Sequence, residues 1–186
     1  PVFVGDTLNF TVSVSEAALN GFKAGGLPIY PTGTVTVTDV SGLIQLTGQL
    51  NNGLLAAAAP WLPAGPYTVT GQYGGNQRYL PGTSNALVQV VEPLPTAVND
   101  AGGTLQATPV TIKVLANDLD PVGRGLTVSA LTVQPIHGTA EVSADGLAVH
   151  YLPYAEFVGL DSFTYVVADG NGSTDGTAPS DTNIYD

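Results

Sequence analysis

The chain contains no cysteine, and its 186 residues include only four Lys and Arg residues against 15 Asp and Glu residues. The lack of cysteine excludes disulfide bonds, thiol catalysis and thiolate metal sites. The formal net charge of −11 disfavours nucleic acid and anionic membrane surfaces as partners, because clustered Lys and Arg side chains bind both. We recognise no signal peptide and no apolar run long enough to span a bilayer, so we expect no membrane insertion in this segment.

Alternating apolar and polar residues are the most prominent pattern that the sequence does contain. Apolar and polar residues alternate through 8–14, and the same period of two returns at Phe163, Tyr165 and Val167. This alternation predicts strands with one buried face. No stretch has sustained helical periodicity, so we expect an all-β fold made of two tandem Ig-like or cadherin-like β-sandwiches.

Two turn signals predict hairpins. Asn51-Asn52-Gly53 separates 43–50 from 54–59 in the first half of the chain. Asp145-Gly146 lies between two alternating stretches of the second half. Such dipeptides favour the tight turns that join antiparallel strands, so we expect each pair of stretches to form a hairpin.

The length of the chain fits two small domains. We expect a β-sandwich in residues 1–92, a stiff proline-rich linker in residues 93–96, and a second β-sandwich in residues 97–186. The C-terminal edge of the second sandwich should be irregular or incomplete, because no alternating Val and Thr stretch follows Gly172. A truncated chain, an irregular closing segment and a strand supplied by a neighbouring molecule would each account for this.

Acidic and amide side chains recur at the predicted strand ends of the second half. They are Asn99, Asp100, Asn117, Asp118, Asp120 and Asp169. Ca²⁺ takes about six to eight oxygen ligands, and loops from alternate strands of a sandwich gather at one pole. The six residues are therefore candidate Ca²⁺ ligands. The alternative is that they only form turns, since Asn and Asp side chains bond their own backbone. Asp161 is a further candidate that equally suits a turn cap.

No catalytic residues can be named. The two histidines, His137 and His150, lie apart and lack further zinc ligands nearby in the sequence, and no nucleophile-elbow motif occurs. Trp61 could stack on a sugar together with several tyrosines, although such aromatics more often fill a sandwich core. These tyrosines are Tyr30, Tyr67, Tyr73 and Tyr79.

The first half resembles a bacterial Ig-like repeat found in tandem in large surface proteins. The matching segments are 4–6, 10–12, 31–35, 62–65 and 73–76 with Tyr79. Asn76 stands where that family usually has Asp. The second half resembles the cadherin-like tandem repeat of bacterial adhesins. Its matching segments are 97–100, 114–120, 137–139, 151–153 and 157–165.

These resemblances imply a secreted or cell-surface protein of many repeats, with adhesion or spacing as its role and no catalytic activity. The cadherin-like resemblance also implies Ca²⁺ at an acidic pole. We therefore expect a stiff spacer, with adjacent repeats of the same protein and a surface receptor or glycan as partners, and with self-association through edge strands. Two alternatives stay open, which are a pilus-like filament subunit and a carbohydrate-binding accessory module of a secreted enzyme.

Overall fold

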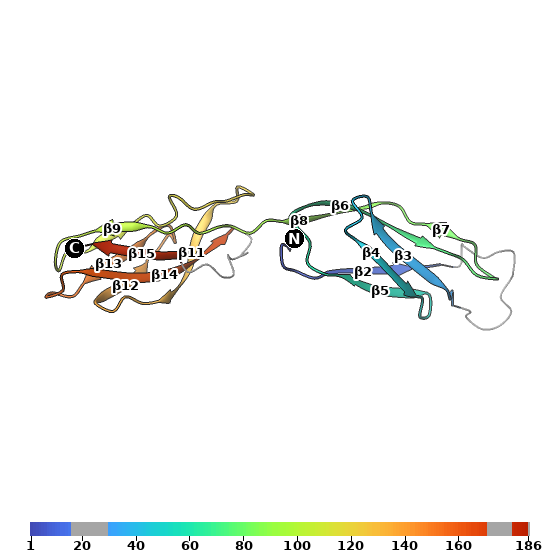
Figure 1. Cartoon of the computed structure of the whole chain (residues 1–186), viewed down its shortest axis with the longest axis horizontal. Helices are drawn as coiled ribbons and strands as arrows, with labels where there is room; N and C mark the ends of the chain where they lie inside the picture. Colours follow the sequence, from blue (N-terminus) through green and yellow to red (C-terminus); the bar gives the residue numbers. More distant parts are fainter. Residues whose placement is uncertain (16–29, 171–179, 186) are drawn as a thin grey trace. The chain divides into compact units, whose positions relative to one another are not determined.

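The computed structural model describes residues 1–15, 30–170 and 180–185, and these residues form strands, turns and loops without any helix. The chain divides into two compact units, Pro1–Pro93 and Leu94–Asp186 (Figure 1). A search of the described segments for a helix that could cross a membrane found none. Because both units consist of strands packed in sheets, the expected all-β fold class is confirmed.

The N-terminal unit is a sandwich of two sheets. The larger sheet has the order β1-β8-β6-β3-β4, with β7 beside β6, and the smaller sheet pairs β2 with β5. All these pairs are antiparallel except β1 and β8, which run parallel. The strands are β1 (Val2–Phe3), β2 (Leu8–Ser13), β3 (Thr34–Asp39), β4 (Gln45–Gln49), β5 (Leu54–Ala59), β6 (Gly65–Tyr73), β7 (Gly82–Thr83) and β8 (Leu87–Glu92).

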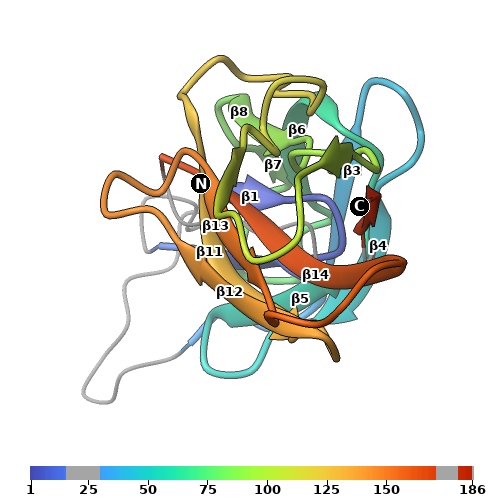
Figure 2. The same cartoon turned by 90° about the vertical axis from the view of Figure 1, so that its left-hand side faces the viewer.

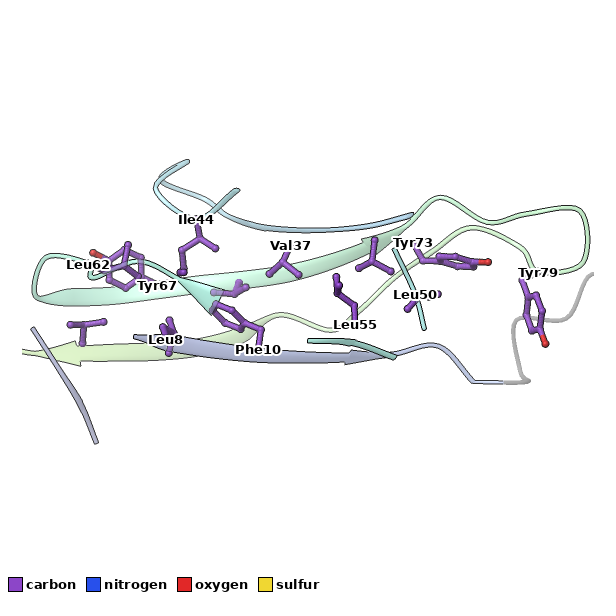
Figure 3. Packing of buried hydrophobic residues seen from close by; sticks show 14 residues of the cluster. Leu8, Phe10, Val37, Ile44, Leu50, Leu55, Leu62, Tyr67, Tyr73 and Tyr79 are labelled. Carbon is purple, nitrogen blue, oxygen red and sulfur yellow. The ribbon is translucent and has the colours of Figure 1, made fainter. Parts of the chain in front are cut away.

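Alternation along the strands builds the core of this unit. Val35 and Val37 of β3 are 0% and 2% exposed, whereas the threonines that alternate with them are only half-buried. From the opposite sheet, Leu8 and Phe10 of β2 point toward β6 (Figure 3). Each fully buried side chain of this kind contributes about 1.5–3 kcal/mol to folding.

The first predicted hairpin is correct only at its turn. Asn51 and Leu54 exchange backbone hydrogen bonds of 2.8 and 3.0 Å, and Asn52 and Gly53 have φ angles of 51° and 80°. Beyond the turn the two strands separate, because β4 pairs with β3 and β5 pairs with β2. Leu50 and Leu55, on either side of the turn, are both buried in the core. The chain therefore crosses from one sheet to the other here, which buries both leucines.

Tyr67 fixes the start of β6 to the preceding loop. Its side chain is 5% exposed, and its hydroxyl donates a 2.8 Å hydrogen bond to the Pro63 carbonyl oxygen. A tyrosine that bonds backward to the chain in this way is typical of Ig-like sandwiches. We expect Tyr67→Phe to lower the unfolding free energy of the N-terminal unit by about 0.5–1.5 kcal/mol, because the hydrogen bond between the Tyr67 hydroxyl and the Pro63 carbonyl oxygen is lost. Urea denaturation measures this change. Tyr30→Phe, at a 51% exposed position, should have no effect, and an equal loss in both variants would contradict the assignment.

The C-terminal unit also has two sheets, β10-β13-β12 and β11-β14-β15-β9 (Figures 1 and 2). Its core is centred on β14, where Phe163, Tyr165 and Val167 are each 0% exposed. The strands are β9 (Ala101–Gly103), β10 (Val110–Ile112), β11 (Leu126–Val133), β12 (Gly138–Val142), β13 (Val149–Pro153), β14 (Leu160–Asp169) and β15 (Ser180–Tyr185). The second predicted hairpin is confirmed, since β12 and β13 pair around Asp145-Gly146.

The expectation of an irregular or incomplete C-terminal edge is wrong. Ser180–Tyr185 forms β15, which pairs antiparallel with β14 on one side and parallel with β9 on the other. Without this strand, the backbone groups of β14 and β9 would lack partners along the gap between them. The segment is a strand despite the absence of a Val and Thr alternation, because backbone hydrogen bonds to two neighbours do not depend on that pattern.

Candidate functional site

Tyr165 is the centre of a polar cluster at one end of the C-terminal core. Alternation along β14 directs its side chain inward between Phe163 and Val167, and its ring is completely buried. Two segments outside the strands bring polar groups to its hydroxyl, one before β9 and one after β10. A backbone bridge between Thr96 and Leu119, with hydrogen bonds of 3.0 and 2.9 Å, ties these two segments together.

Five oxygen atoms surround the Tyr165 hydroxyl. Asp100 Oδ2 and the Val114 carbonyl oxygen each lie 2.8 Å away. The two carboxylate oxygens of Asp118 lie at 3.4 and 3.3 Å, and the Val98 carbonyl oxygen lies at 3.4 Å. A phenol has one hydrogen to donate, so the Tyr165 hydroxyl cannot satisfy all of these acceptors at once. The cluster gathers oxygen atoms of two carboxylates and two backbone carbonyl groups around this hydroxyl.

Backbone and amide hydrogen bonds complete this cluster. The Val98 N–H donates to Asp118 Oδ1 at 2.8 Å, and Asn117 Nδ2 donates to the Asn99 carbonyl oxygen at 3.0 Å. Four of the six residues that the sequence predicted as Ca²⁺ ligands therefore come together. They are Asn99, Asp100, Asn117 and Asp118.

The electrostatics of the cluster disfavour negative charge on Asp100. Burial raises the pKa of this carboxyl above its usual value, and the nearby Asp118 carboxylate raises it further. Hydrogen bonds from Tyr165 and Asn117 act in the opposite direction without cancelling the rise. A proton or a cation at this place would relieve both burial and repulsion.

The other two predicted ligands, Asp120 and Asp169, contact other groups of the protein. Asp120 accepts backbone N–H groups of Gly123 and Gly125 at 2.7 Å each. Burial acts to raise the Asp120 pKa, but these backbone hydrogen bonds outweigh it and lower the pKa. Asp169 is buried and forms an ion pair with Arg124, with 3.3 Å between Oδ2 and the guanidinium. Asp120 thus caps a turn, and Asp169 neutralises an arginine.

The oxygen atoms near Tyr165 are of the kinds that Ca²⁺ takes as ligands, namely carboxylate, amide and backbone carbonyl oxygens. Among the described residues, however, no group of three or more His, Cys, Asp and Glu side chains gathers as a metal site. A cation here would thus rest on two carboxylates, Asp100 and Asp118, with neutral oxygens supplying the remaining ligands. The donor set fits Ca²⁺ and does not fit zinc, which takes nitrogen and sulfur ligands.

Asp161 caps backbone groups at a separate place in the unit. Its carboxylate accepts the N–H groups of Ile136, His137 and Ser162 at 2.9–3.0 Å, and the Tyr151 hydroxyl at 2.9 Å. The His137 ring stacks on Phe157 with 4.2 Å between ring centroids. This arrangement gives Asp161 and His137 structural partners.

A hollow of about 880 Å³ lies against the three-stranded sheet, and Ser143, Asp145 and His150 are among its lining residues. Ser143 Oγ donates to Asp145 Oδ1 at 2.6 Å, whereas His150 Nδ1 lies 2.9 Å from Thr111 Oγ1. A hydrolytic triad needs serine bonded to histidine and histidine bonded to aspartate. These hydrogen bonds do not make that connection.

The aromatic residues do not form a stacking row. Tyr67, Tyr73 and Tyr79 are buried in the core of the N-terminal unit, and Trp61 and Tyr30 are 64% and 51% exposed. The hydroxyl groups of Tyr67 and Tyr73 donate to the carbonyl oxygens of Pro63 and Thr32, as a buried tyrosine requires. Three of the five proposed sugar contacts are therefore core residues.

Sequence reasoning missed Tyr165 as the centre of the site, treating it only as a buried strand residue. One signal could have identified it. Tyr165 occupies an inward position between Phe163 and Val167, and a tyrosine at such a position needs a partner for its hydroxyl. The acidic segments at 98–100 and 114–118 are the polar groups that a buried hydroxyl would seek.

Comparison with protein families gives one match for each half of the chain. The family described as "Bacterial Ig-like domain (group 3)" matches residues 1–92, and the family described as "Bacterial Ig domain" matches residues 93–180. Among curated proteins, none matches the chain.

Several solved structures are similar at low identity. The fibronectin(III)-like modules of Clostridium thermocellum CbhA are 11% identical, over 99% of this chain and 87% of that one, with a TM-score of 0.35. Domains 4 and 5 of the S-layer protein SbsC are 16% identical over the whole of both chains, with a TM-score of 0.30. The endo-fucoidan hydrolase MfFcnA9 from glycoside hydrolase family 107 is 16% identical over 100% of this chain, which spans 32% of the hydrolase, with a TM-score of 0.34.

Proposed function

Because the chain belongs to the bacterial Ig-like domain families, group 3 in residues 1–92 and the bacterial Ig domain family in residues 93–180, we propose that it is a stiff spacer of a cell-surface or secreted protein. Domains of these families are typical of extracellular and surface proteins and are generally non-catalytic. The acidic composition supports this role, since a net charge of −11 keeps an array of modules soluble. Adjacent repeats of the same protein are the expected partners, together with a surface receptor.

The joint between the modules supports stiffness. Pro93 and Pro95 flank Leu94 in the segment that links the two units. Proline fixes its own φ angle and restricts the residue before it, so a short linker with two prolines has few conformations. Such a linker acts as a semi-rigid spacer and restricts the rotation of one module against the next.

We further propose that Ca²⁺ binds the polar cluster around Tyr165. The observation that carries this proposal is the set of five oxygen atoms, from Asp100, Asp118 and the Val98 and Val114 carbonyl groups, within 3.4 Å of the Tyr165 hydroxyl. Asp100 and Asp118 would hold the ion. The carbonyl oxygens of Val98 and Val114 and the amide oxygen of Asn117 would be further ligands. The bound charge would offset the burial and repulsion that raise the Asp100 pKa, and it would tie the segment before β9 to the segment after β10.

Thermal unfolding with Ca²⁺ and with a chelator tests this proposal. A ligand that binds only the folded state raises its stability by RT ln(1 + [L]/Kd), about 2.7 kcal/mol at a concentration of 100 Kd. We expect the Tm of the C-terminal unit to rise in Ca²⁺ while the Tm of the N-terminal unit stays constant. Equal midpoints in Ca²⁺ and chelator would refute Ca²⁺ binding, and the spacer role would then rest on the family assignment, the linker and the acidic composition.

Asp100→Asn is the matched variant. In chelator at pH 7 it should unfold at a higher temperature than the native chain, because the amide removes a disfavoured charge and supplies donors to an acceptor-rich cluster. The advantage should shrink as the pH falls from 7 toward the raised pKa of Asp100. A carboxyl whose folded pKa is raised stabilises the fold when protonated, and loses that contribution as the pH rises through the folded pKa. In Ca²⁺ the variant should show a smaller rise than the native chain. An unchanged Ca²⁺ response would exclude Asp100 as a ligand.

The filament alternative loses the observation that motivated it, and the carbohydrate-binding alternative keeps only the exposed Trp61 and Tyr30. The filament reading rested on a missing closing strand, and β15 occupies that position. The carbohydrate-binding reading rested on an exposed aromatic row, and three of its tyrosines are in the core.

A further inference from the structure

The hollow on the outer face of the three-stranded sheet has no part in the functions proposed above. Alternation along β10 and β13 directs Ile112 and Val149 into the core, so that Lys113, directly after β10, and His150 of β13 point outward. Both outward side chains line this hollow of about 880 Å³. Among its described lining residues, none belongs to the polar cluster around Tyr165, so the two places are separate.

Hydrogen bonds within each wall hold the shape of the hollow. One wall is the segment between β10 and β11, where Asp120 accepts the Gly123 N–H with Oδ1 and the Gly125 N–H with Oδ2, at 2.7 Å each. The other wall is the hairpin between β12 and β13, where the Ser143 N–H donates to the Ala148 carbonyl oxygen at 2.9 Å. The hollow is therefore formed before a ligand arrives, and its volume is within the range of about 300–1,000 Å³ that small-ligand sites have.

Aliphatic side chains make up half of the lining. Six of the twelve lining residues are Leu or Ala, and none is Phe, Tyr or Trp. Leu147, on the hairpin wall, is 51% exposed and offers apolar surface to a ligand. Burial of such surface favours a ligand with aliphatic groups, whereas a sugar binds best where an aromatic ring can stack on it.

Lys113 and Asp145 carry opposite charges in the same hollow without forming an ion pair. Within the described part of the chain, Lys113 forms neither a hydrogen bond nor an ion pair. Asp145 Oδ1 accepts hydrogen bonds from Ser143 and Leu147, which lower the pKa of this carboxyl, and the charge of His150 lowers it further. No other described residue donates to Asp145 Oδ2. A positive group and a negative group are thus both open to a ligand.

We propose that this hollow binds a short aliphatic peptide whose two termini are free, with the peptide carboxylate on Lys113 and the peptide ammonium group on Asp145. The aliphatic side chains of the peptide cover Leu147 and its neighbours. A zwitterionic peptide matches all three open features, namely the positive group, the negative group and the aliphatic surface. A fatty acid or an alkyl amine leaves one charge unmatched, and a sugar leaves the aliphatic surface uncovered.

Lys113 makes this place distinctive on an acidic surface. Only four of the 186 residues are Lys or Arg, and Arg124 is already paired with Asp169. The other carboxylate in the hollow, Asp120, has both oxygen atoms in hydrogen bonds to its own turn. Peptide binding in this hollow can succeed or fail independently of the spacer role and of Ca²⁺ binding at Tyr165.

NMR titration of the full chain with the tripeptide Leu-Ala-Leu, in chelator at pH 7, tests the ligand class. We expect shifts confined to residues 111–126 and 143–150 and a Kd of about 1 mM. The N-acetylated and the C-amidated peptides should each bind about three times more weakly, because each loses one exposed ion pair. Gly-Gly-Gly should bind about ten times more weakly, because it has no aliphatic side chain. An absence of shifts in these segments up to about 10 mM peptide, or equal affinity for free and blocked peptides, would overturn the proposal.

Two variants assign the peptide termini. Lys113→Gln should bind the free and the amidated peptide equally, and Asp145→Asn should bind the free and the acetylated peptide equally. Asparagine keeps an oxygen for the hydrogen bonds that Asp145 accepts in the hairpin, so the wall stays in place. Arg78→Gln is the matched control, since it removes an exposed cation of the N-terminal unit and should leave both preferences unchanged. A Lys113→Gln variant that still prefers the free carboxylate would show that Lys113 does not bind it, and the proposed orientation would be wrong.

Discussion

Asp161→Ala is expected to lower the Tm of the C-terminal unit by more than about 10 °C, the largest effect of any single substitution considered for this chain. The carboxylate is 7% exposed and accepts four hydrogen bonds, three from backbone N–H groups and one from the Tyr151 hydroxyl. A buried donor left without an acceptor costs about 1–3 kcal/mol. With water relieving part of this cost, we expect a total of about 3–5 kcal/mol, against about 5–15 kcal/mol for a domain of this size.

Calorimetry of the full chain measures this effect against an internal reference, because the N-terminal unit should unfold at an unchanged temperature. Asp145→Ala is the matched control. Asp145 also accepts hydrogen bonds from a serine hydroxyl and a backbone N–H, but it lies in an exposed turn of the same unit. Its loss should cost about 1 kcal/mol or less, because water replaces the lost partners. If Asp145→Ala were as damaging as Asp161→Ala, the role given to Asp161 as a buried anchor of the 136–137 segment would be wrong.

Tyr165→Phe should produce the second large effect, and its size should depend on Ca²⁺. In chelator the change removes the only hydrogen shared by Asp100 and the Val114 carbonyl oxygen through this hydroxyl. Because one of these acceptors is a carboxylate, we expect a loss of about 1–3 kcal/mol or slightly more. In Ca²⁺ the loss should be smaller, because the ion supplies positive charge to the same oxygens.

Urea denaturation of the C-terminal unit with and without Ca²⁺ measures both values for Tyr165→Phe. Tyr154→Phe, at a 56% exposed position in the same unit, controls for the loss of a phenol alone and should change neither value. If Tyr165→Phe lost the same free energy of unfolding in Ca²⁺ and in chelator, the contribution of the hydroxyl would not depend on a bound cation. A negligible loss in both conditions would mean that water replaces the hydroxyl in the cluster.

Local features of this fold could be predicted from the sequence. Alternation identified the buried face of β2 and the inward positions Phe163, Tyr165 and Val167 of β14, because burial follows directly from a period of two. The turn at Asn51-Asn52-Gly53 was also predictable, since Asn and Gly tolerate the positive φ angles found there. The sheet to which β4 and β5 belong was not, because pairing depends on residues far away in the sequence.

The candidate site could be predicted only in part for the same reason. Spacing placed Asn99, Asp100, Asn117 and Asp118 at strand ends, and these are close in space. Asp120 and Asp169 have the same local appearance, but each has a nearer partner, a backbone turn for the first and Arg124 for the second. The residues that surround an Asp in the sequence do not show which hydrogen-bond donor its carboxylate will contact in the fold. The closing strand β15 was missed for a similar reason, because its partners β14 and β9 are distant in the sequence.

The parallel pairing of first and last strands has a mechanical consequence. β1 runs parallel to β8 in one unit, and β9 runs parallel to β15 in the other. When a chain is pulled from its two ends, strands paired in this way are drawn past each other, so their hydrogen bonds carry the load together and do not open one after another. An antiparallel pair pulled from adjacent ends would peel apart bond by bond. In each module, tension along the chain therefore loads the hydrogen bonds of this strand pair in shear, which suits the proposed spacer.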